Sequence, residues 1–406
     1  MLHHRTLALA AVAALGLTTA PVFAQAGDTI TLGAAVSLTG KYSTNGGHTQ
    51  KGYDLAVKKI NDAGGVKVGG KTYKIEVRYY DDESTPARGA ELAERLIQQD
   101  GIKFLLGPYS SGMTKAIAPV TEQHKVPMVE ANGASRSLFT NNYKYLFAIL
   151  STSEKYLASA VTLAAENAEA LGKKPSEMKV ALAFENDNFS QDVRAGVLED
   201  LKKNNMKVVI DDELPRDLND MSATLTKVKA LKPDMLVVSG HSKGAATAIR
   251  QLDQMQIHVP ILAMTHCDAA GIIKKFGKAA SYTLCGTQWA PSLTYSDKLF
   301  GTAADFAKEF DKAYGYEPPY QAAESAAAVE VYANAFERAG SLDPQKVRDA
   351  LASTDMMTFY GAIKFDDTGK NIAKPMALYQ VLDGKYEVVA PSKFAQTKAV
   401  VPAPTD

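Results

Sequence analysis

Short apolar runs alternate along the chain with longer segments in which apolar residues recur every three to four positions. The short runs predict buried strands, and the longer segments predict helices that pack on one face. The strands and apolar runs lie at 29–36, 74–80, 104–106, 126–129, 145–149, 179–184, 206–210, 235–238, 261–264, 281–290, 360–365 and 376–382. The predicted helices begin near residues 48, 86, 113, 153, 191, 221, 244, 297, 320 and 344. This alternation predicts an α/β fold with parallel sheets, in two stretches of similar plan.

The segment LLGPYSSGMT, residues 105–114, marks the point where a buried strand breaks into a polar turn and a helix begins. The N-terminus of a helix carries unpaired N–H groups and a partial positive charge. Together with the hydroxyl groups of Ser110 and Ser111, these groups form a site suited to a carboxylate. The alternative is a simple helix cap, in which a serine satisfies its own helix and binds no ligand.

Six polar loops follow predicted strands in this pattern. They are SLTGKYSTNGG (37–47), GPYSSG (107–112), ANGAS (131–135), ENDNFSQ (185–191), SGHSKG (239–244) and THCDAA (265–270). Ligands of parallel α/β sheets bind beyond the carboxyl ends of the strands. We therefore expect the six loops to meet in a cleft between two lobes.

Composition and charge exclude several classes of function. The 406 residues, 46% of them hydrophobic, are enough for more than one packed core. The chain has 45 basic and 45 acidic residues, so it has no basic field for nucleic acid or an anionic membrane. It also lacks a nucleophile elbow, a phosphate-binding P-loop and a zinc-protease motif. We therefore expect a protein that is not an enzyme and has no cofactor or metal.

The first residues have the pattern of a secretory signal peptide. Two histidines and Arg5 precede an apolar run at 7–17, and small residues lead up to Ala24. We expect cleavage after Ala24, with Ala26 as the alternative. No cysteine stands directly after the leader, and no later stretch approaches about 18 apolar residues. These features predict a periplasmic protein that is neither a lipoprotein nor inserted in the membrane.

The two cysteines, Cys267 and Cys285, lie close together in the sequence. Export permits a disulfide, which would add about 3 kcal/mol to stability. The alternative is a pair of buried thiols that act as small apolar side chains. Both interpretations are open, because a sequence does not place the two Cα atoms within bonding reach.

The order of these loops behind a signal peptide resembles the solute-binding proteins of ABC importers of the branched-chain amino acid type. The resemblance rests on AAVSLTGKYSTNGG, KGYDLAVKKINDAGGV, YYDDESTPARGAELAERLI, KFLLGPYSSGMT and YGAIKFDDTGK. It implies the type I periplasmic binding fold, with two doubly wound α/β lobes joined by a three-segment hinge that crosses near Leu150, Gln288 and Pro375. Lobe one would hold 25–150 and 289–374, and lobe two 151–288 and 375–406, after a signal peptide at 1–24.

The resemblance also implies a ligand site. In lobe one, Ser111 and the run Gly133, Ala134 and Ser135 would hold a carboxylate, with backbone groups of Tyr109 beside them. Tyr42 and Asn45 belong to a loop that approaches the cleft. In lobe two, the family's aromatic positions match Phe189 and His241, and Trp289 lies at the predicted hinge near the cleft.

One loop departs from the family. Amino-acid binders place an acidic residue where this chain has Thr265 or His266, with Asp268 beyond it. A buried ammonium without a carboxylate would cost several kcal/mol. We therefore expect the ligand to be a small carboxylate with an apolar or aromatic body, enclosed by the rings of lobe two. The alternative ligand is a branched-chain or other hydrophobic amino acid, or an amide.

Each ring residue also has a structural interpretation. His241 and His266 could be ordinary polar loop residues, Trp289 could pack the hinge, and Phe189 could be a hydrophobic staple.

With the ligand site as the preferred interpretation, we expect a monomeric binding protein that closes on its ligand and docks on an ABC permease of the inner membrane. The other functional class is a sensory binding domain, which a cleavable leader without a later membrane span disfavours.

Overall fold

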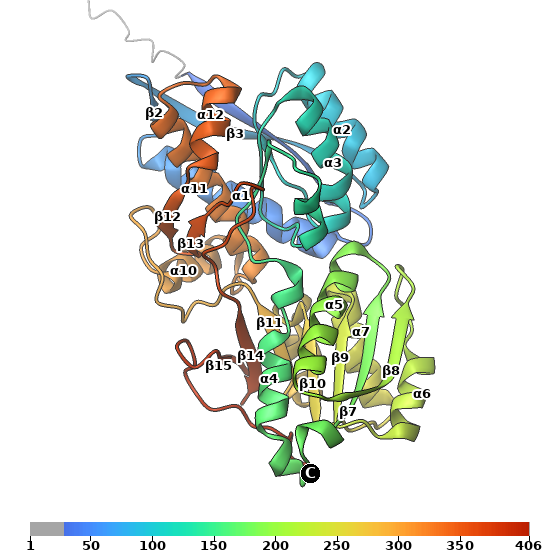
Figure 1. Ribbon diagram of the computed structural model, residues 1–406. Helices are drawn as coiled ribbons and strands as arrows, with labels where there is room; N and C mark the ends of the chain where they lie inside the picture. Colours follow the sequence, from blue (N-terminus) through green and yellow to red (C-terminus); the bar gives the residue numbers. More distant parts are fainter. Residues whose placement is uncertain (1–27, 406) are drawn as a thin grey trace, which may run out of the picture.

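The computed structural model describes residues 28–405 and shows two lobes, each built around one sheet (Figure 1). The predicted signal peptide, residues 1–24, lies outside the described residues. We call the lobe of the six-stranded sheet lobe one and the lobe of the seven-stranded sheet lobe two. The two-lobed α/β fold class expected from the sequence is confirmed.

Lobe one has the strand order β2-β3-β1-β4-β5-β6. Its strands are β1 (Thr29–Val36), β2 (Val66–Val68), β3 (Lys71–Asp81), β4 (Leu105–Leu106), β5 (Met128–Glu130) and β6 (Leu146–Ala148). All neighbours pair in parallel except β2 with β3. The helices are α1 (Ser43–Asp62), α2 (Pro86–Gln98), α3 (Ser111–His124), α10 (Ala303–Tyr314), α11 (Tyr320–Ala339) and α12 (Pro344–Ala352).

The long helix α11 forms the centre of lobe one, because it is buried on almost every side. Its alanine-rich surface lets α1 pack closely against it. The hydroxyl of Tyr332 lies 2.8 Å from the carbonyl oxygen of Leu105 and 2.6 Å from that of Pro127, which ties α11 to the sheet.

Lobe two has the strand order β15-β14-β11-β10-β9-β7-β8. Its strands are β7 (Lys179–Glu185), β8 (Lys207–Leu214), β9 (Met235–Ser239), β10 (Ile261–Thr265), β11 (Leu284–Thr287), β14 (Ala377–Leu382) and β15 (Lys385–Ala390). Its helices are α4 (Ala158–Glu166), α5 (Asn188–Lys203), α6 (Ser222–Leu231), α7 (His241–Gln254), α8 (Cys267–Ala270) and α9 (Ile272–Phe276). The central strands β7, β9 and β10 are buried almost throughout, as parallel strands between two helical layers must be.

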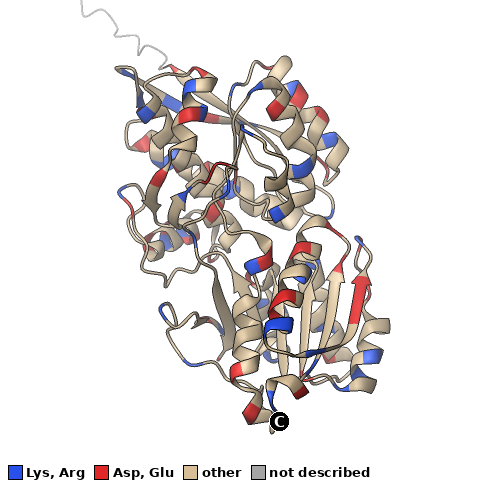
Figure 2. Ribbon diagram, viewed as in Figure 1, with Lys and Arg blue, Asp and Glu red and all other residues tan. Residues whose placement is uncertain are grey.

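The remaining elements are short. A two-stranded ribbon pairs β12 (Asp355–Thr358) with β13 (Gly361–Lys364). The 3₁₀ helices are η1 (Arg136–Thr140), η2 (Ser153–Lys155), η3 (Ala168–Leu171), η4 (Pro175–Glu177) and η5 (Gly277–Ala280). Each described helix is too short or too polar to span a bilayer. Basic and acidic residues are interspersed over both lobes in the view of Figure 2.

Several predicted elements differ from the observed ones. The sheets are not purely parallel, because β2, β14 and β15 pair antiparallel. The helix expected from 297 begins at Ala303, since Thr302 and Asp305 form a capping box that fixes its start. Helix α1 begins at Ser43, five residues before the expected start. The sequence did not show this start, because the first turns are polar and lack apolar periodicity.

Three chain segments cross between the lobes, and buried hydrogen bonds join them to one another. Gln288 donates to the carbonyl of Ser151 (2.8 Å), and its side-chain oxygen accepts from the Ser151 amide (3.1 Å). The Ser151 hydroxyl donates to the carbonyl of Lys374, and the Lys374 ammonium donates to the carbonyl of Gln288. We call this set the hinge triangle. Ser151 and Gln288 are fully buried and Lys374 is 4% exposed, and this burial lowers the pKa of Lys374 to about 7.

Cys267 and Cys285 form a disulfide, with their Cα atoms 6.0 Å apart. Of the two interpretations left open by the sequence, a disulfide and a pair of buried free thiols, the structure shows the disulfide. The bond joins the start of α8 to β11, next to the loop that carries Thr265 and His266.

We expect replacement of both cysteines by alanine to lower the free energy of unfolding by about 3 kcal/mol, because the disulfide restricts the unfolded chain. Equilibrium unfolding in guanidinium measures this change. Wild-type protein unfolded in the presence of a reductant serves as the control and should match the double variant. Equal stability of the oxidised and reduced proteins would contradict the prediction.

Candidate functional site

The six polar loops meet where the two lobes face each other. Hydrogen bonds and ion pairs join the lobes at Lys41 with Glu185, Asn45 with Ser242, Ser135 with Asp192, Tyr109 with His266, and Arg136 with Glu199. The expectation that these loops share one interlobe cleft is therefore met by the structure.

The N-terminus of α3 opens onto this cleft. Ser110 has a positive φ of 85° and caps α3, accepting a hydrogen bond from the Met113 amide at 3.4 Å. The Ser111 hydroxyl accepts from the Ser135 amide at 3.0 Å, which ties the GPYSSG loop to the ANGAS loop. The cap interpretation is thus correct for Ser110, and the same turn still presents the start of a 14-residue helix to the cleft.

Glu130 lies beneath both loops and is fully buried. One of its carboxyl oxygens, Oε1, accepts from the amides of Asn132 and Gly133, the latter at 2.7 Å. The other, Oε2, lies 2.8 Å from the Thr114 hydroxyl. A Cβ atom at Gly107 would come within 2.1 Å of Oε2, and one at Gly133 within 2.3 Å of the Thr114 hydroxyl. Glycine at both positions is therefore required by the close approach of the chain to this carboxyl group.

The hydrogen bonds of Thr114 fit either form of Glu130. The Thr114 hydroxyl lies within hydrogen-bond distance of both Glu130 Oε2 and the Ser110 carbonyl, the latter at 2.9 Å. Protonated Glu130 can donate to Thr114, which then donates to Ser110, and ionised Glu130 can accept from Thr114, because the Ser110 carbonyl also accepts from the Thr114 amide at 3.0 Å. Burial raises the pKa of Glu130 to about 7, although the hydrogen bonds from nearby amides and Thr114 oppose this shift.

Five rings from both lobes pack together in the cleft. We call this set, Tyr42, Tyr109, Phe189, His241 and His266, the interlobe ring cluster. Ring centroids are 5.0 Å apart for Tyr42 and His241, 5.1 Å for Phe189 and His266, and 5.1 Å for the two histidines. Offset and edge contacts at this spacing are favourable, so the rings form one packed cluster.

The Tyr109 hydroxyl is the polar centre of the ring cluster. It accepts a hydrogen bond from Asn45 and lies 2.8 Å from His241 Nδ1 and 3.0 Å from His266 Nε2. A hydroxyl has one proton and two lone pairs, so one imidazole accepts from Tyr109 and the other donates to it. Burial, with a contribution from His241, lowers the pKa of His266 well below its usual value, so His266 is neutral.

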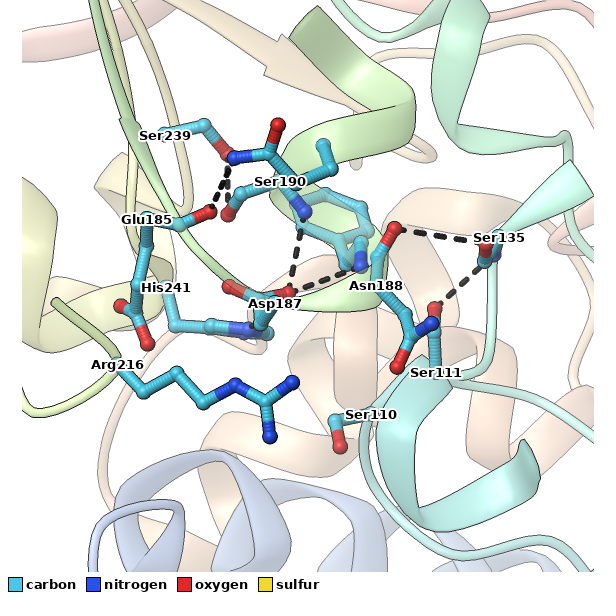
Figure 3. Close-up of polar contacts among 12 residues, drawn as sticks. Ser110, Ser111, Ser135, Glu185, Asp187, Asn188, Ser190, Arg216, Ser239 and His241 are labelled. Atoms are coloured by element: carbon cyan, nitrogen blue, oxygen red, sulfur yellow. Dashed lines mark hydrogen bonds and ion pairs between the residues drawn. The ribbon is translucent and has the colours of Figure 1, made fainter. Parts of the chain in front are cut away.

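A cavity of about 690 Å³ lies at the cleft, within the range of about 300 to 1,000 Å³ typical of small-molecule sites. Tyr42, Ser110 and Gly112 line it from lobe one. Asp187, Asn188 and Arg216 line it from lobe two. Figure 3 shows the Arg216 guanidinium group extending toward Ser110 from the opposite side. The cavity therefore lies between a helix N-terminus and charged groups of the other lobe.

Of the predicted site residues, only Tyr42 and Ser110 line this cavity. The others belong to the interlobe ring cluster or to the hydrogen-bonded loops beside it, with one exception. Thr265 is buried, and its hydroxyl lies 3.1 Å from that of Ser239. The Gly133 amide donates to Glu130, and the Ala134 carbonyl accepts from the Ser153 amide at 2.8 Å. The groups of these two residues that point into the protein thus already have partners, which leaves the Gly133 carbonyl and the Ala134 amide for other contacts.

Trp289 is the exception. Its ring packs against Phe306 and Phe359, at centroid distances of 5.7 and 6.3 Å, and its Nε1 donates to the Phe359 carbonyl at 3.1 Å. The side chain is fully buried. The structure places it in hinge packing and outside the interlobe ring cluster.

Most residues that line the cavity were absent from the sequence-based site, among them the charged residues Asp187 and Arg216. Asp187 caps α5, because its Oδ1 accepts from the amides of Phe189 (2.9 Å) and Ser190 (3.1 Å). Its position before a helix could have identified the cap but not the cavity. The Arg216 Nε donates to the Asn186 carbonyl at 2.6 Å, which orients its guanidinium group.

Asp268 does not replace the missing acid of the THCDAA loop. Its carboxylate oxygens accept from the amides of Ala269 (2.8 Å) and Tyr320 (3.3 Å), so it caps α11 from the other lobe. Among residues 28–405, no three His, Cys, Asp or Glu side chains group closely enough to hold a metal ion.

A family model described as "Periplasmic binding protein" matches residues 29–385. The leucine-, isoleucine-, valine-, threonine- and alanine-binding protein of Pseudomonas aeruginosa is 22% identical over 357 residues, covering 88% of this chain and 91% of that protein.

Solved structures share the fold over most of the chain. The branched-chain amino acid transporter substrate-binding protein of Streptococcus pneumoniae, in complex with isoleucine, is 25% identical with a TM-score of 0.76, covering 90% of this chain and 100% of that one. A solute-binding protein of an ABC transporter from Rhodopseudomonas palustris, in complex with 3,4-dihydroxybenzoic acid, is 20% identical with a TM-score of 0.77, covering 92% and 99%.

We expect Glu130→Gln to preserve the fold, because the glutamine amide can donate to Thr114 as the protonated acid does. Native Glu130 keeps its proton up to about pH 7, whereas the unfolded group loses it near pH 4.5. Its contribution to stability is therefore complete below pH 4.5 and is lost as the pH rises to about 7. Urea unfolding across this pH range should show that the advantage of wild type over Glu130→Gln declines.

Glu130→Ala provides the contrast, since it leaves two buried amides unpaired at about 1 to 3 kcal/mol each. A constant difference between wild type and Glu130→Gln from pH 4.5 to 7 would contradict the protonated assignment.

Proposed function

The chain belongs to the periplasmic binding protein family, and on this premise we propose that it is the substrate-binding component of an ABC importer. In this role it captures a small carboxylate between its lobes and delivers it to a permease of the inner membrane. One observation carries the proposal. The N-terminus of α3, at Ser110 and Gly112, lines a cavity closed from the other side by lobe two.

The anion end of the ligand would lie at α3. Unpaired backbone amides and the helix dipole favour a carboxylate there. Arg216 adds a cation that reaches into the same cavity from lobe two, and a charge-assisted contact from a guanidinium group is stronger than one between neutral groups.

The body of the ligand would contact the interlobe ring cluster, which favours an aromatic or apolar acid. Tyr42 belongs both to that cluster and to the cavity lining. The Rhodopseudomonas palustris structure, whose bound ligand is an aromatic acid, shares the fold and agrees with this choice. The comparison supports the ligand class and does not by itself assign it.

A branched-chain or other hydrophobic amino acid is the second candidate ligand. Asp187 favours it, because this buried carboxylate lines the cavity and could pair with an ammonium group. The Pseudomonas aeruginosa and Streptococcus pneumoniae relatives, which bind such amino acids by their names, are consistent with it.

Lobe closure would be the mechanism of capture. The two lobes already share the pairs Lys41 with Glu185 and Asn45 with Ser242, so a ligand that contacts both walls adds to interactions present in the closed form. Such a ligand shifts the population toward closure by its differential affinity for that form. We propose that the protein works as a monomer and performs no reaction on the bound molecule.

In calorimetric titrations we expect benzoate-type or phenyl-substituted acids to bind more tightly than leucine or valine, because the ring cluster offers aromatic contacts. Trp289, buried near the hinge, supplies an independent fluorescence signal. Tight leucine binding without binding of aromatic acids would replace the first ligand class by the second. Binding of neither class would contradict the proposed function.

We expect Ser111→Ala to weaken carboxylate binding by about 1 to 3 kcal/mol, since it removes the partner of the Ser135 amide and a hydroxyl at the start of α3. The same titrations measure the loss. Ser222→Ala, at the start of α6 in lobe two, is the control and should bind as wild type does. Unchanged affinity in Ser111→Ala would remove Ser111 from the site.

A further inference from the structure

Lys41 is a side chain of lobe one whose hydrogen bonds lie in lobe two. Its ammonium group donates to the carboxylate of Glu185, at the end of β7, and to the backbone carbonyl of Arg216, in the loop after β8. The Glu185 side chain is fully buried, and its second oxygen has no partner among residues 28–405. A buried carboxylate requires a donor, and Lys41 supplies it when the lobes are closed.

The turn that carries Lys41 is fixed within lobe one. The Ser84 hydroxyl donates to the Thr39 carbonyl at 2.7 Å and accepts from the Tyr42 amide at 3.0 Å. One hydroxyl group thus ties the chain on both sides of Lys41. Gly40 has a φ of 80°, and a Cβ atom there would come within 2.8 Å of a backbone carbonyl oxygen. Because its turn is held in this way, Lys41 moves with lobe one and reaches lobe two only as the lobes approach each other.

Arg216 is the group that this contact positions. Its residue is exposed, and ordering a long exposed side chain costs conformational entropy. Within lobe two, its Nε donates to the Asn186 carbonyl at 2.6 Å, and its own carbonyl accepts from Lys41. Arg216 lines the cavity, and Figure 3 shows its guanidinium group extending toward Ser110. Lys41 therefore fixes the backbone from which this cation reaches the start of α3.

Lys41 itself has little capacity left for a ligand. An ammonium group has three donors, and two of them serve Glu185 and the Arg216 carbonyl. The group also lies 5.0 Å from the centre of the Tyr42 ring, a cation–π distance. Burial lowers the pKa of Lys41 to about 8, so the ammonium is still protonated at neutral pH. These contacts indicate that Lys41 acts through Arg216 and not on the ligand directly.

We propose that Lys41 is a positioning residue of the carboxylate site. On closure it enters lobe two, pairs with Glu185 and holds the backbone at Arg216, so that the guanidinium group faces the N-terminus of α3 only in the closed protein. The inference rests on the proposed function, because it takes the ligand carboxylate to lie between α3 and Arg216. It makes the selection of acids over neutral analogues depend on a residue that does not touch the ligand.

Acids and their amides test the proposal by isothermal titration calorimetry on the intact protein. Benzoate with benzamide, and leucine with leucinamide, are pairs that differ in the charged carboxylate. Wild type should prefer the acid in each pair that it binds. Lys41→Met keeps the apolar stem and removes the ammonium group, and we expect the preference to fall about tenfold, as the loss of one charge-assisted contact predicts. A merely structural role would weaken acid and amide equally.

A double-mutant cycle shows whether Lys41 acts through Arg216. Arg216→Gln should lower the same preference. Lys41→Met should cost acid binding at least about threefold less in Arg216→Gln than in wild type, because the contact that it supports is already absent. Lys243→Met removes another cation of the cavity lining, one that pairs with Asp217 within lobe two at 2.8 Å, and should cause a smaller loss. Lys58→Met, at an exposed ion pair of α1, is the control and should behave as wild type does.

Several results would overturn the inference while the proposed function stands. They are an equal cost of Lys41→Met in both backgrounds, an equal loss of preference in Lys243→Met, and an unchanged preference in Lys41→Met. Absence of binding by every acid would overturn the proposed function and the inference together. Thermal unfolding shows separately whether Lys41→Met is folded. Glu185→Gln is a second variant and should give a smaller loss of the same kind, because a glutamine oxygen still accepts from Lys41 but lacks the charge.

Discussion

The buried carboxyl group of Glu130 is the constraint on which the site depends. It holds the amides of Asn132 and Gly133 with one oxygen and contacts Thr114, in the first turns of α3, with the other. Glu130 therefore holds the loop 131–135 and the first turns of α3 in fixed positions relative to each other, with the N-terminus of α3 directed at the cleft. The absence of side chains at Gly107 and Gly133 permits this contact. A rigid base of this kind would preorganise the proposed anion site before any ligand arrives.

The two lobes are held together in two places of different character. At the hinge triangle, Ser151, Gln288 and Lys374 join the three crossing segments through hydrogen bonds that are buried from solvent. At the cleft, the contacts are side-chain pairs such as Lys41 with Glu185, and burial lowers the pKa of Lys41 to about 8 despite the nearby Asp187. The hinge therefore keeps the lobes in register, while the cleft contacts can exchange with a ligand and with water during opening and closing.

The sequence predicted the fold well because strand and helix periodicities are local properties. It also predicted that Phe189, His241 and His266 belong to one site, since each follows a parallel strand whose end faces the cleft. It did not identify Glu130, because one acidic residue at the end of an apolar run gives no indication that two loops depend on it. It missed Asp187 because a polar residue before a helix identifies a cap but not a place in a cavity wall. Trp289 was expected at the hinge near the cleft, and its packing with Phe306 and Phe359 agrees with the alternative of hinge packing and not with a ligand contact.

A crystal structure of the protein with its tightest-binding acid tests the central claim most directly. The account predicts that the ligand carboxylate lies within hydrogen-bond distance of the amides at Ser111 and Gly112, between α3 and Arg216. It also predicts that the body of the acid contacts Tyr42 in the interlobe cavity. An acid bound outside this cavity, or bound with its carboxylate directed away from α3, would contradict the account.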